Sequence, residues 1–156
     1  MRNIIALAIL ILAGAASARE VQPCDLSIGG VVSGDTEANV LALLGEPSQR
    51  IDTGEGIEFQ YPGLVVTVGW LEQKANGVQR HVVALRGNGP KACTPRGLCP
   101  GMAVSEVSRL YGPSDPVQRS YGTFIEYQPP NVGCWLQVSR KPVSFIPWAW
   151  YVSHEA

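Results

Sequence analysis

The strongest constraint on the fold of this chain is an internal repeat. Residues 34–45 read GDTEANVLALLG and residues 101–112 read GMAVSEVSRLYG, so glycines, a valine and a leucine recur at matching positions. Further along, GIEFQYPG at 56–63 resembles FIEYQPPN at 124–131. The offsets between the blocks fall in expected loops, where insertions are tolerated. Matches in the same order predict a duplication, so that both halves share one structural unit.

Each copy is predicted to begin with a short helix. Apolar residues at helical spacing indicate helices over about 36–44 and 103–111. Thr36 is suited to cap the first helix, whereas Ala103 leaves the start of the second helix poorly capped. A glycine and a nearby proline follow each helix and are expected to stop it.

Strand signals follow each helix, and short turns between them favour antiparallel neighbours. We therefore predict an α+β fold of two tandem modules, 19–90 and 91–156, each a short helix packed on a four-stranded antiparallel meander. The Gly- and Pro-rich segment 87–101 is expected to link the modules. The expected strands span about 48–53, 56–61, 64–71 and 79–86 in the first copy and about 116–121, 123–128, 132–140 and 143–152 in the second.

The N-terminal segment has the pattern of a secretory signal peptide. Arg2 precedes an apolar run, and Ala16-Ser17-Ala18 supplies the small residues of a cleavage site. We expect residues 1–18 to be removed after Ala18, which places the mature protein in the periplasm or outside the cell. A membrane anchor is the alternative, but the apolar run is shorter than the roughly 20 residues of a span. No later segment is expected to cross a membrane.

Composition excludes some classes of function. With 46% hydrophobic and 16% charged residues, the chain is expected to be globular rather than disordered. The formal net charge is −1, and the loss of Arg2 with the signal peptide makes it more negative. Because proteins that bind nucleic acids need a basic face, we expect no nucleic acid partner.

An even number of cysteines in an exported chain suggests two disulfides. The repeat aligns Cys99 with Val32 and Cys134 with Val66, which favours a Cys99–Cys134 pair. The cysteines that remain would then form Cys24–Cys93. The alternative is a local Cys93–Cys99 loop with a Cys24–Cys134 pair.

No set of catalytic residues stands out. The serines lie in no Gly-x-Ser-x-Gly motif, and no phosphate-binding loop is present. His81 and His154 lie near no cysteine, so we expect no metal site. A Cys–His enzyme is an alternative, but four cysteines in an exported chain favour disulfides, and both histidines are expected to be solvated. The repeat aligns Glu58 with Glu126, which is the one suggestion of a glycosidase-type carboxylate pair, but outward positions on strands explain both. We therefore predict a protein that is not an enzyme and binds no cofactor.

The side of the sheet away from the helices is the candidate binding surface. Strand residues alternate between faces, so the residues between the predicted core positions point outward. Trp and Tyr mixed with Glu and Gln are typical of protein interfaces. The alternative is that this face is buried between the two modules. The candidate binding residues are Trp135, Tyr151, Glu126, Gln128, Glu58 and Gln60.

The repeated pattern of a glycine, a short helix with a central valine, a glycine stop and then strands resembles a group of exported bacterial proteins. The β-lactamase inhibitor proteins have two such modules in tandem, and the BamE-type outer-membrane assembly lipoproteins have one. The resemblance covers about residues 26–152 and implies a sheet that grips a protein partner, or a periplasmic scaffold. The chain departs from the lipoproteins by lacking a lipid-attachment cysteine, and from the inhibitors in cysteine placement.

These features together predict an exported, non-catalytic protein-binding module of the inhibitor, immunity or assembly-partner type. Its partner is expected to be another exported or envelope protein. An envelope scaffold that acts in outer-membrane assembly is the first alternative, and a small secreted hydrolase is the second.

Overall fold

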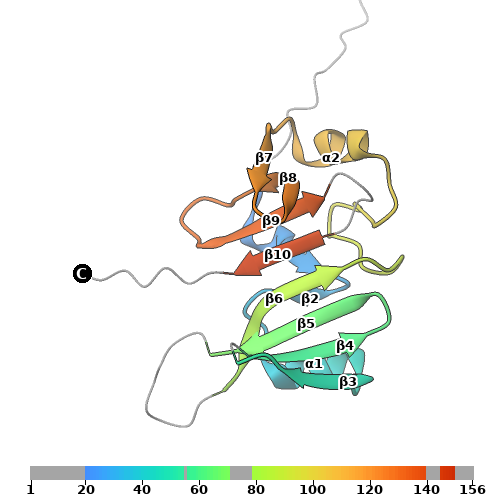
Figure 1. The fold of residues 1–156 in the computed structure, drawn as a ribbon, viewed down its shortest axis with the longest axis vertical. Coiled ribbons are helices and arrows are strands. Elements are labelled where there is room, and N and C mark those ends of the chain that lie inside the picture. Colours follow the sequence, from blue (N-terminus) through green and yellow to red (C-terminus); the bar gives the residue numbers. More distant parts are fainter. Residues whose placement is uncertain (1–19, 55, 71–78, 140–144, 150–156) are drawn as a thin grey trace, which may run out of the picture.

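A single large antiparallel sheet organises the protein. The computed structural model describes residues 20–54, 56–70, 79–139 and 145–149. Within these residues the chain has an α+β fold with two α-helices, an eight-stranded sheet and a two-stranded hairpin. The strand order in the large sheet is β3-β4-β5-β6-β10-β9-β8-β7. Figure 1 shows these strands stacked with a strong twist along the length of the molecule.

Strands that follow one another in the chain lie side by side within β3–β6 and again within β7–β10. β6 pairs with β10 through Gly87 opposite Phe145 and Ala84 opposite Trp148, so the two sets of strands form one continuous sheet. Each predicted strand overlaps an observed one. The strands are β3 Gln49–Asp52, β4 Ile57–Tyr61, β5 Leu64–Gly69, β6 His81–Gly87, β7 Pro116–Arg119, β8 Gly122–Tyr127, β9 Cys134–Ser139 and β10 Phe145–Ala149.

Two helices of equal length precede the two sets of strands. α1 spans Glu37–Leu44 and α2 spans Val104–Tyr111, which agrees with the predicted positions. Thr36 Oγ1 accepts a 3.1 Å hydrogen bond from the amide of Asn39, so the predicted cap is present. Ala103 caps α2 with no side-chain hydrogen bond, as its methyl group requires. Both helices end at a glycine with a positive φ, 76° at Gly45 and 89° at Gly112.

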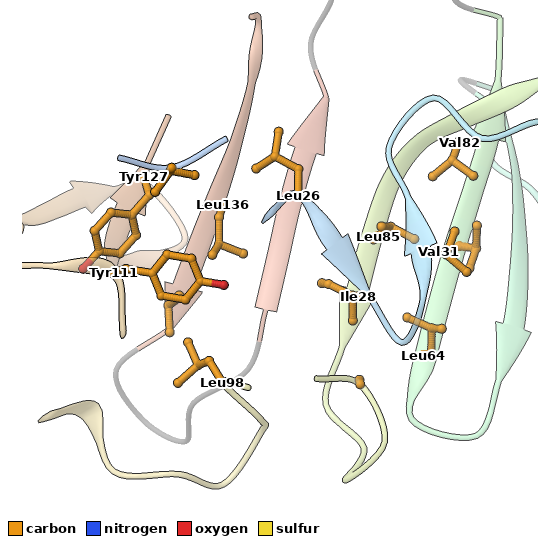
Figure 2. Packing of buried hydrophobic residues seen from close by; sticks show 14 of the residues in the cluster. Leu26, Ile28, Val31, Leu64, Val82, Leu85, Leu98, Tyr111, Tyr127 and Leu136 are labelled. Atoms are coloured by element: carbon orange, nitrogen blue, oxygen red, sulfur yellow. The ribbon is translucent and has the colours of Figure 1, made fainter. Parts of the chain in front are cut away.

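A short hairpin precedes α1, and the sequence patterns did not predict it. β1 (Ser27–Ile28) pairs with β2 (Val31–Val32) after a 3-10 turn at Pro23–Asp25. Ile28 and Val31 are fully buried. Figure 2 shows their side chains lying between the hairpin and Leu64, Val82 and Leu85 of the sheet. The hairpin therefore covers the middle of the sheet and fills the core between the helices.

The core lies on one face of the large sheet. Phe59, Val66 and Leu85 pair across β4, β5 and β6 and are almost fully buried. In the other half, Leu136 and Val138 of β9 take the same role beneath Val107 and Tyr111 of α2. Figure 2 shows Tyr111, Tyr127 and Leu98 gathered around Leu136. Val132, at the start of the predicted strand 132–140, is only half-buried, because it lies in a loop before β9 begins.

The segment predicted as a linker is part of the folded core. Ala92 and Leu98 are buried, and the Thr94 amide donates a 2.8 Å hydrogen bond to the Leu98 carbonyl. The Tyr111 hydroxyl donates a 2.7 Å hydrogen bond to Thr94 Oγ1, which ties this loop to the end of α2. Sequence periodicity did not predict this burial, because a tight loop buries single residues that are not regularly spaced.

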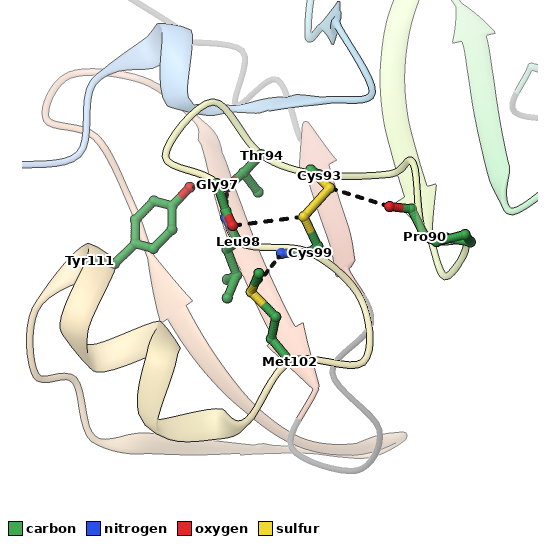
Figure 3. Close-up of a disulfide and its surroundings, with 8 residues drawn as sticks. All are labelled: Pro90, Cys93, Thr94, Gly97, Leu98, Cys99, Met102 and Tyr111. Carbon is green, nitrogen blue, oxygen red and sulfur yellow. Dashed lines mark hydrogen bonds between the residues drawn. A yellow bond between two sulfur atoms is a disulfide. The ribbon is translucent and has the colours of Figure 1, made fainter.

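The favoured disulfide pairing is wrong. The structure has a local disulfide between Cys93 and Cys99, which closes the loop over α2 (Figure 3). Cys24 and Cys134 carry free thiols, the first exposed and the second half-buried beside Ser33. The alignment of Cys99 with Val32 predicted the wrong partner for Cys99, because the loop around Cys99 folds back and brings it to Cys93.

The described helices are each eight residues long, and none of them is long and apolar enough to span a bilayer.

Candidate binding face

The sheet has a second face that neither the helices nor the hairpin cover, and we call it the open face. Phe59 points into the core, so its neighbours Glu58 and Gln60 point to the open face. Leu136 is likewise a core residue, which places Trp135 and Gln137 on the open face. Glu126 lies directly opposite Gln137 in the β8–β9 pair. Four of the six predicted site residues, Glu58, Gln60, Glu126 and Trp135, are therefore on this face.

Glu126 is the centre of a hydrogen-bonded cluster on the second half of the open face. Arg119 holds its carboxylate with two hydrogen bonds, 2.9 Å from Nε to Oε1 and 2.6 Å from Nη2 to Oε2. Gln137 Nε2 donates a third bond of 2.6 Å to Oε1. The bonds from Arg119, and to a smaller extent the one from Gln137, lower the pKa of Glu126, while partial burial acts in the opposite direction. The carboxylate is thus ionised at neutral pH and has its charge neutralised within the chain.

Aromatic side chains lie beside this cluster. Phe124 is 4% exposed although it lies outside the main core, and Tyr121 packs on it with ring centroids 5.2 Å apart. The Tyr121 ring is 58% exposed, and its hydroxyl lies 3.4 Å from Gln137 Nε2. Tyr121 therefore packs on Phe124 and lies beside Gln137. We call these three residues, together with Trp135 on the same face, the patch.

Two buried polar atoms in this patch have no hydrogen-bond partner. They are the indole Nε1 of Trp135 and the amide Oε1 of Gln137. Gln137 is fully buried, and Trp135 is half-buried. Nearly all buried polar atoms in folded proteins are paired, so two orphans on neighbouring positions of one strand need an explanation.

The first half of the open face carries a smaller polar cluster. Arg86 reaches across β5 to Glu58, with 2.6 Å between Nη2 and Oε1, and Gln60 Nε2 donates a 2.9 Å bond to Glu58 Oε2. Half of Arg86 is exposed to solvent, so the pair adds little stability. As in the other half, however, the carboxylate is matched by an arginine of the same face.

Glu58 and Glu126 do not form a catalytic pair. They lie on β4 and β8, five strand spacings apart in the sheet order. Each spacing is roughly 4.8 Å, whereas glycosidase carboxylates lie about 5–10 Å from each other. His81 is half-buried at the start of β6, and its Nδ1 lies 3.0 Å from the carbonyl oxygen of Gly34. Among the described residues, no group of His, Cys, Asp and Glu side chains could hold a metal ion.

The remaining predicted residues do not join the cluster. Gln128 lies just past the end of β8, where its side chain donates a 2.9 Å hydrogen bond to the carbonyl of Val132. It thus closes the β8–β9 loop rather than facing a partner. Tyr151 and His154 lie outside the described residues.

Sequence reasoning missed Arg119, Tyr121, Phe124 and Arg86 as members of this face. Arg119 ends β7 and Tyr121 lies in the β7–β8 turn, and only the register of these strands brings the two side chains over Glu126 and Gln137. The sequence Ser120-Tyr121-Gly122 is typical of a tight turn, and such a turn would have indicated an aromatic ring at the surface of the sheet.

A hollow lies between the N-terminal described segment and α2. Its volume is about 440 Å³, and its lining includes Cys24, Asp25, Arg96 and Leu110. Arg96 pairs with Asp25 at 2.7 Å, and it also donates to the carbonyls of Glu20 and Leu110. These bonds tie the segment around Glu20 and Asp25 to the end of α2, so a structural role accounts for the charges in this hollow.

Comparisons with known proteins place little constraint on this chain. No protein-family model matches it, and no curated protein does. Among solved structures, an extracellular protein containing a SCP domain from Bacillus anthracis str. Ames is similar over 92% of this chain, with a TM-score of 0.43 and 16% identity. The chain spans 50% of the length of that protein.

Proposed function

We propose that this protein is an exported, non-catalytic protein-binding module that uses the open face of its sheet. The observation that carries the proposal is the patch around Trp135, where aromatic rings lie beside charges that are already paired within the chain. The disulfide between Cys93 and Cys99 is consistent with export to an oxidising compartment. Cleavage of residues 1–18 after Ala18 is part of the proposal.

The composition of the patch supports binding to a protein. Trp and Tyr contribute most to the affinity of protein interfaces when polar groups around them exclude water. Gln137 joins Tyr121 to the Arg119–Glu126 pair, and Trp135 lies two positions before Gln137 on β9. Because both charged groups of that pair are already matched, a partner does not have to neutralise either of them.

A duplicated module is the second part of the proposal, and recurring contacts support it. Tyr61 Oη donates a 2.9 Å hydrogen bond to the carbonyl of Gly45, and Tyr127 Oη donates a 2.6 Å bond to the carbonyl of Gly112. α1 and α2 have the same length and are followed by glycines at the same position. Each half would thus be a helix on a four-stranded meander.

The same contacts revise the alignment of the two copies. Ser48 Oγ donates to the carbonyl of Gln60, and Ser114 Oγ donates to the carbonyl of Glu126. Glu126 therefore corresponds to Gln60, and the match of Glu58 with Glu126 is shifted by two residues. A shift of two along a strand keeps every side chain on its face, so the revised alignment leaves Glu58 and Glu126 on the same side of the sheet.

We include in this proposal a resemblance to the β-lactamase inhibitor proteins. It is supported by one continuous sheet with helices on one face and an aromatic patch on the other. The function that such a fold implies is the inhibition, neutralisation or assembly of another exported protein.

Capture of a partner by the mature chain tests the proposal. Residues 19–156 are immobilised and exposed to the periplasmic and secreted proteins of the source cell, and bound proteins are identified. Trp135→Ala and Tyr121→Ala should each abolish retention of the partner while thermal unfolding stays cooperative. Trp70→Ala is the matched control, because Trp70 is 53% exposed and packs near Arg80, on the side of α1. Equal retention by Trp135→Ala and the native chain would remove the proposed site.

A further inference from the structure

Apart from the proposed function, we infer that β3 pairs with β3 of a second copy of this chain, which joins two sheets into one around a two-fold axis at Ile51. β3 (Gln49–Asp52) is an edge strand of the eight-stranded sheet, and all four of its residues are exposed. Figure 1 shows it at one end of the stack of strands. A strand of another molecule can therefore reach this edge, and the register and charges of β3 favour a second β3.

The hydrogen bonds between β3 and β4 determine which backbone groups reach the free edge. The amide of Thr53 donates a 2.9 Å bond to the carbonyl of Gly56, so these residues form a hydrogen-bonded pair just past the β3–β4 ladder. Hydrogen-bonded pairs alternate along an antiparallel ladder, so Ile51 also bonds to β4. The N–H and C=O groups of Arg50 and Asp52 therefore point away from β4, toward the free edge.

The charges of β3 select one register for a second copy. If Arg50 lies opposite Asp52 of the second copy, each such pair exchanges two backbone hydrogen bonds, and the two-fold axis produces the pair twice. The adjacent registers that use the same groups place Arg50 opposite Arg50, or Asp52 opposite Asp52. Like charges directly opposite each other destabilise a strand pair, whereas opposite charges stabilise it. A charged edge that would repel many strands is thus complementary to itself.

The side chains at the axis fit the same register. Ile51 lies opposite its own counterpart in the second copy, in a pair without backbone hydrogen bonds. The α-carbons of such a pair are about 4.5 Å apart, so the side chains touch. Ile51 is 42% exposed in the single chain, so this contact removes apolar surface from water. Arg50, which lies over the Phe59 ring at 4.7 Å, stays on the core side together with Asp52.

The opposite edge of the sheet is blocked against the same kind of pairing. The two-residue β7–β8 turn closes at the pair of Arg119 with Gly122, so Pro116 and Gln118 face the free edge of β7. Proline has no N–H, and its presence on an edge strand prevents the addition of a further strand. Association through β3 therefore stops at a dimer and does not continue into a fibre.

The dimer has a defined arrangement of its two open faces. Residues that lie opposite each other in a sheet have their side chains on the same face. Glu58, which lies opposite Ile51 on β4, is on the open face, so Ile51 of both copies is on that face as well. The joined sheet therefore presents two copies of the patch on one side.

Cysteine crosslinking at the axis tests this inference. Residues 19–156 are prepared with Cys24→Ser and Cys134→Ser, so that the Cys93–Cys99 disulfide remains and no other thiol is present. Ile51→Cys is added in one version and Gln49→Cys in the other, and both are oxidised with diamide. Ile51→Cys should form a disulfide-linked dimer, because opposite residues without backbone hydrogen bonds lie within disulfide range. Gln49→Cys is the matched control and should stay monomeric, because four residues, roughly 13 Å, separate it from its counterpart.

Sedimentation of the chain without added cysteines measures the association itself. The paired surface is well below the roughly 1,600 Å² of a standard interface, so we expect a reversible dimer with a Kd in the micromolar range. Asp52→Arg places arginines opposite each other and should weaken the dimer about tenfold. Gln118→Arg, on the other edge strand, is the control and should dimerise as the native chain does.

Three results would overturn the inference. They are a native chain that stays monomeric up to about 1 mM, a dissociation constant that Asp52→Arg leaves unchanged, and equal crosslinking from positions 49 and 51. Each of them would leave the proposed role of the patch untouched, because Trp135 and Tyr121 take no part in the pairing.

Discussion

The Tyr127 hydroxyl donates a 2.6 Å hydrogen bond to the carbonyl of Gly112, the residue that ends α2. Tyr61 makes the same contact with Gly45 after α1. In each half, a tyrosine from the second strand of a set thereby closes the C-terminus of the helix against the sheet. Such a contact satisfies a carbonyl that the helix itself leaves without a partner.

The two tyrosine bonds should differ in their effect on stability. Tyr127 and Gly112 are buried, so Tyr127→Phe leaves a buried carbonyl unpaired and should lower the free energy of unfolding by about 1–3 kcal/mol. Tyr61→Phe leaves the carbonyl of the exposed Gly45 to water and should cost about 0.5 kcal/mol. Urea denaturation of the two variants measures both values. A larger loss in Tyr61→Phe would contradict the burial of the second site.

Tyr111 should make the protein sensitive to alkaline pH. Burial raises the pKa of Tyr111 to about 12, and its hydroxyl donates to Thr94 Oγ1. Because the pKa is higher in the folded state than in the unfolded state, this group contributes full stability below pH 10 and loses it as the pH rises through 12. The loss should approach about 2 kcal/mol, and Tyr111→Phe should remove it. Unfolding followed by tyrosinate absorbance and by circular dichroism tests this, and a stability that is flat between pH 10 and 12 would refute it.

Glu126 should titrate below the usual range of a glutamate. Its pKa is lowered mainly by the hydrogen bonds from Arg119, so its contribution to stability is present above the unfolded pKa and is lost as the pH falls through the folded value. Arg119→Met should return the pKa of Glu126 toward 4.5. Carboxyl carbon shifts in an NMR titration report this value directly. An unchanged pKa in Arg119→Met would show that the pair does not form in solution.

The thiol content tests the disulfide. Under denaturing, non-reducing conditions, two of the four cysteines, Cys24 and Cys134, should react with a thiol reagent. Digestion should yield a crosslinked fragment containing Cys93 and Cys99. Replacing both by serine should lower the free energy of unfolding by about 2 kcal/mol, the value for a loop this short. A fragment that joins Cys99 to Cys134 would instead support the pairing inferred from the repeat.

Sequence periodicity predicted those elements that bury one face in a regular pattern. The helices around Val40 and Val107 and the strands around Phe59 and Leu136 follow from spacing alone. The hairpin at Ser27–Val32 was missed because two-residue strands have no period. The loop around Leu98 was missed for the same reason.

For the candidate site, the alternation of side chains along a strand predicted only which residues point outward. Placing Glu58 and Trp135 outward needs no tertiary information. The contact of Arg119 and Tyr121 with Glu126 and Gln137 depends on the β7–β8 turn and on two strand registers. Side chains that meet across such a turn cannot be paired from a single strand's pattern.

Photo-crosslinking from position 121 tests the central claim most directly. A benzophenone amino acid replaces Tyr121 in one version of the protein (residues 19–156) and Trp70 in another, and both are irradiated with the captured partner. The open-face account predicts a crosslinked product from position 121 and none from position 70, which lies on the side of α1. A product from position 70 with none from position 121 would contradict it.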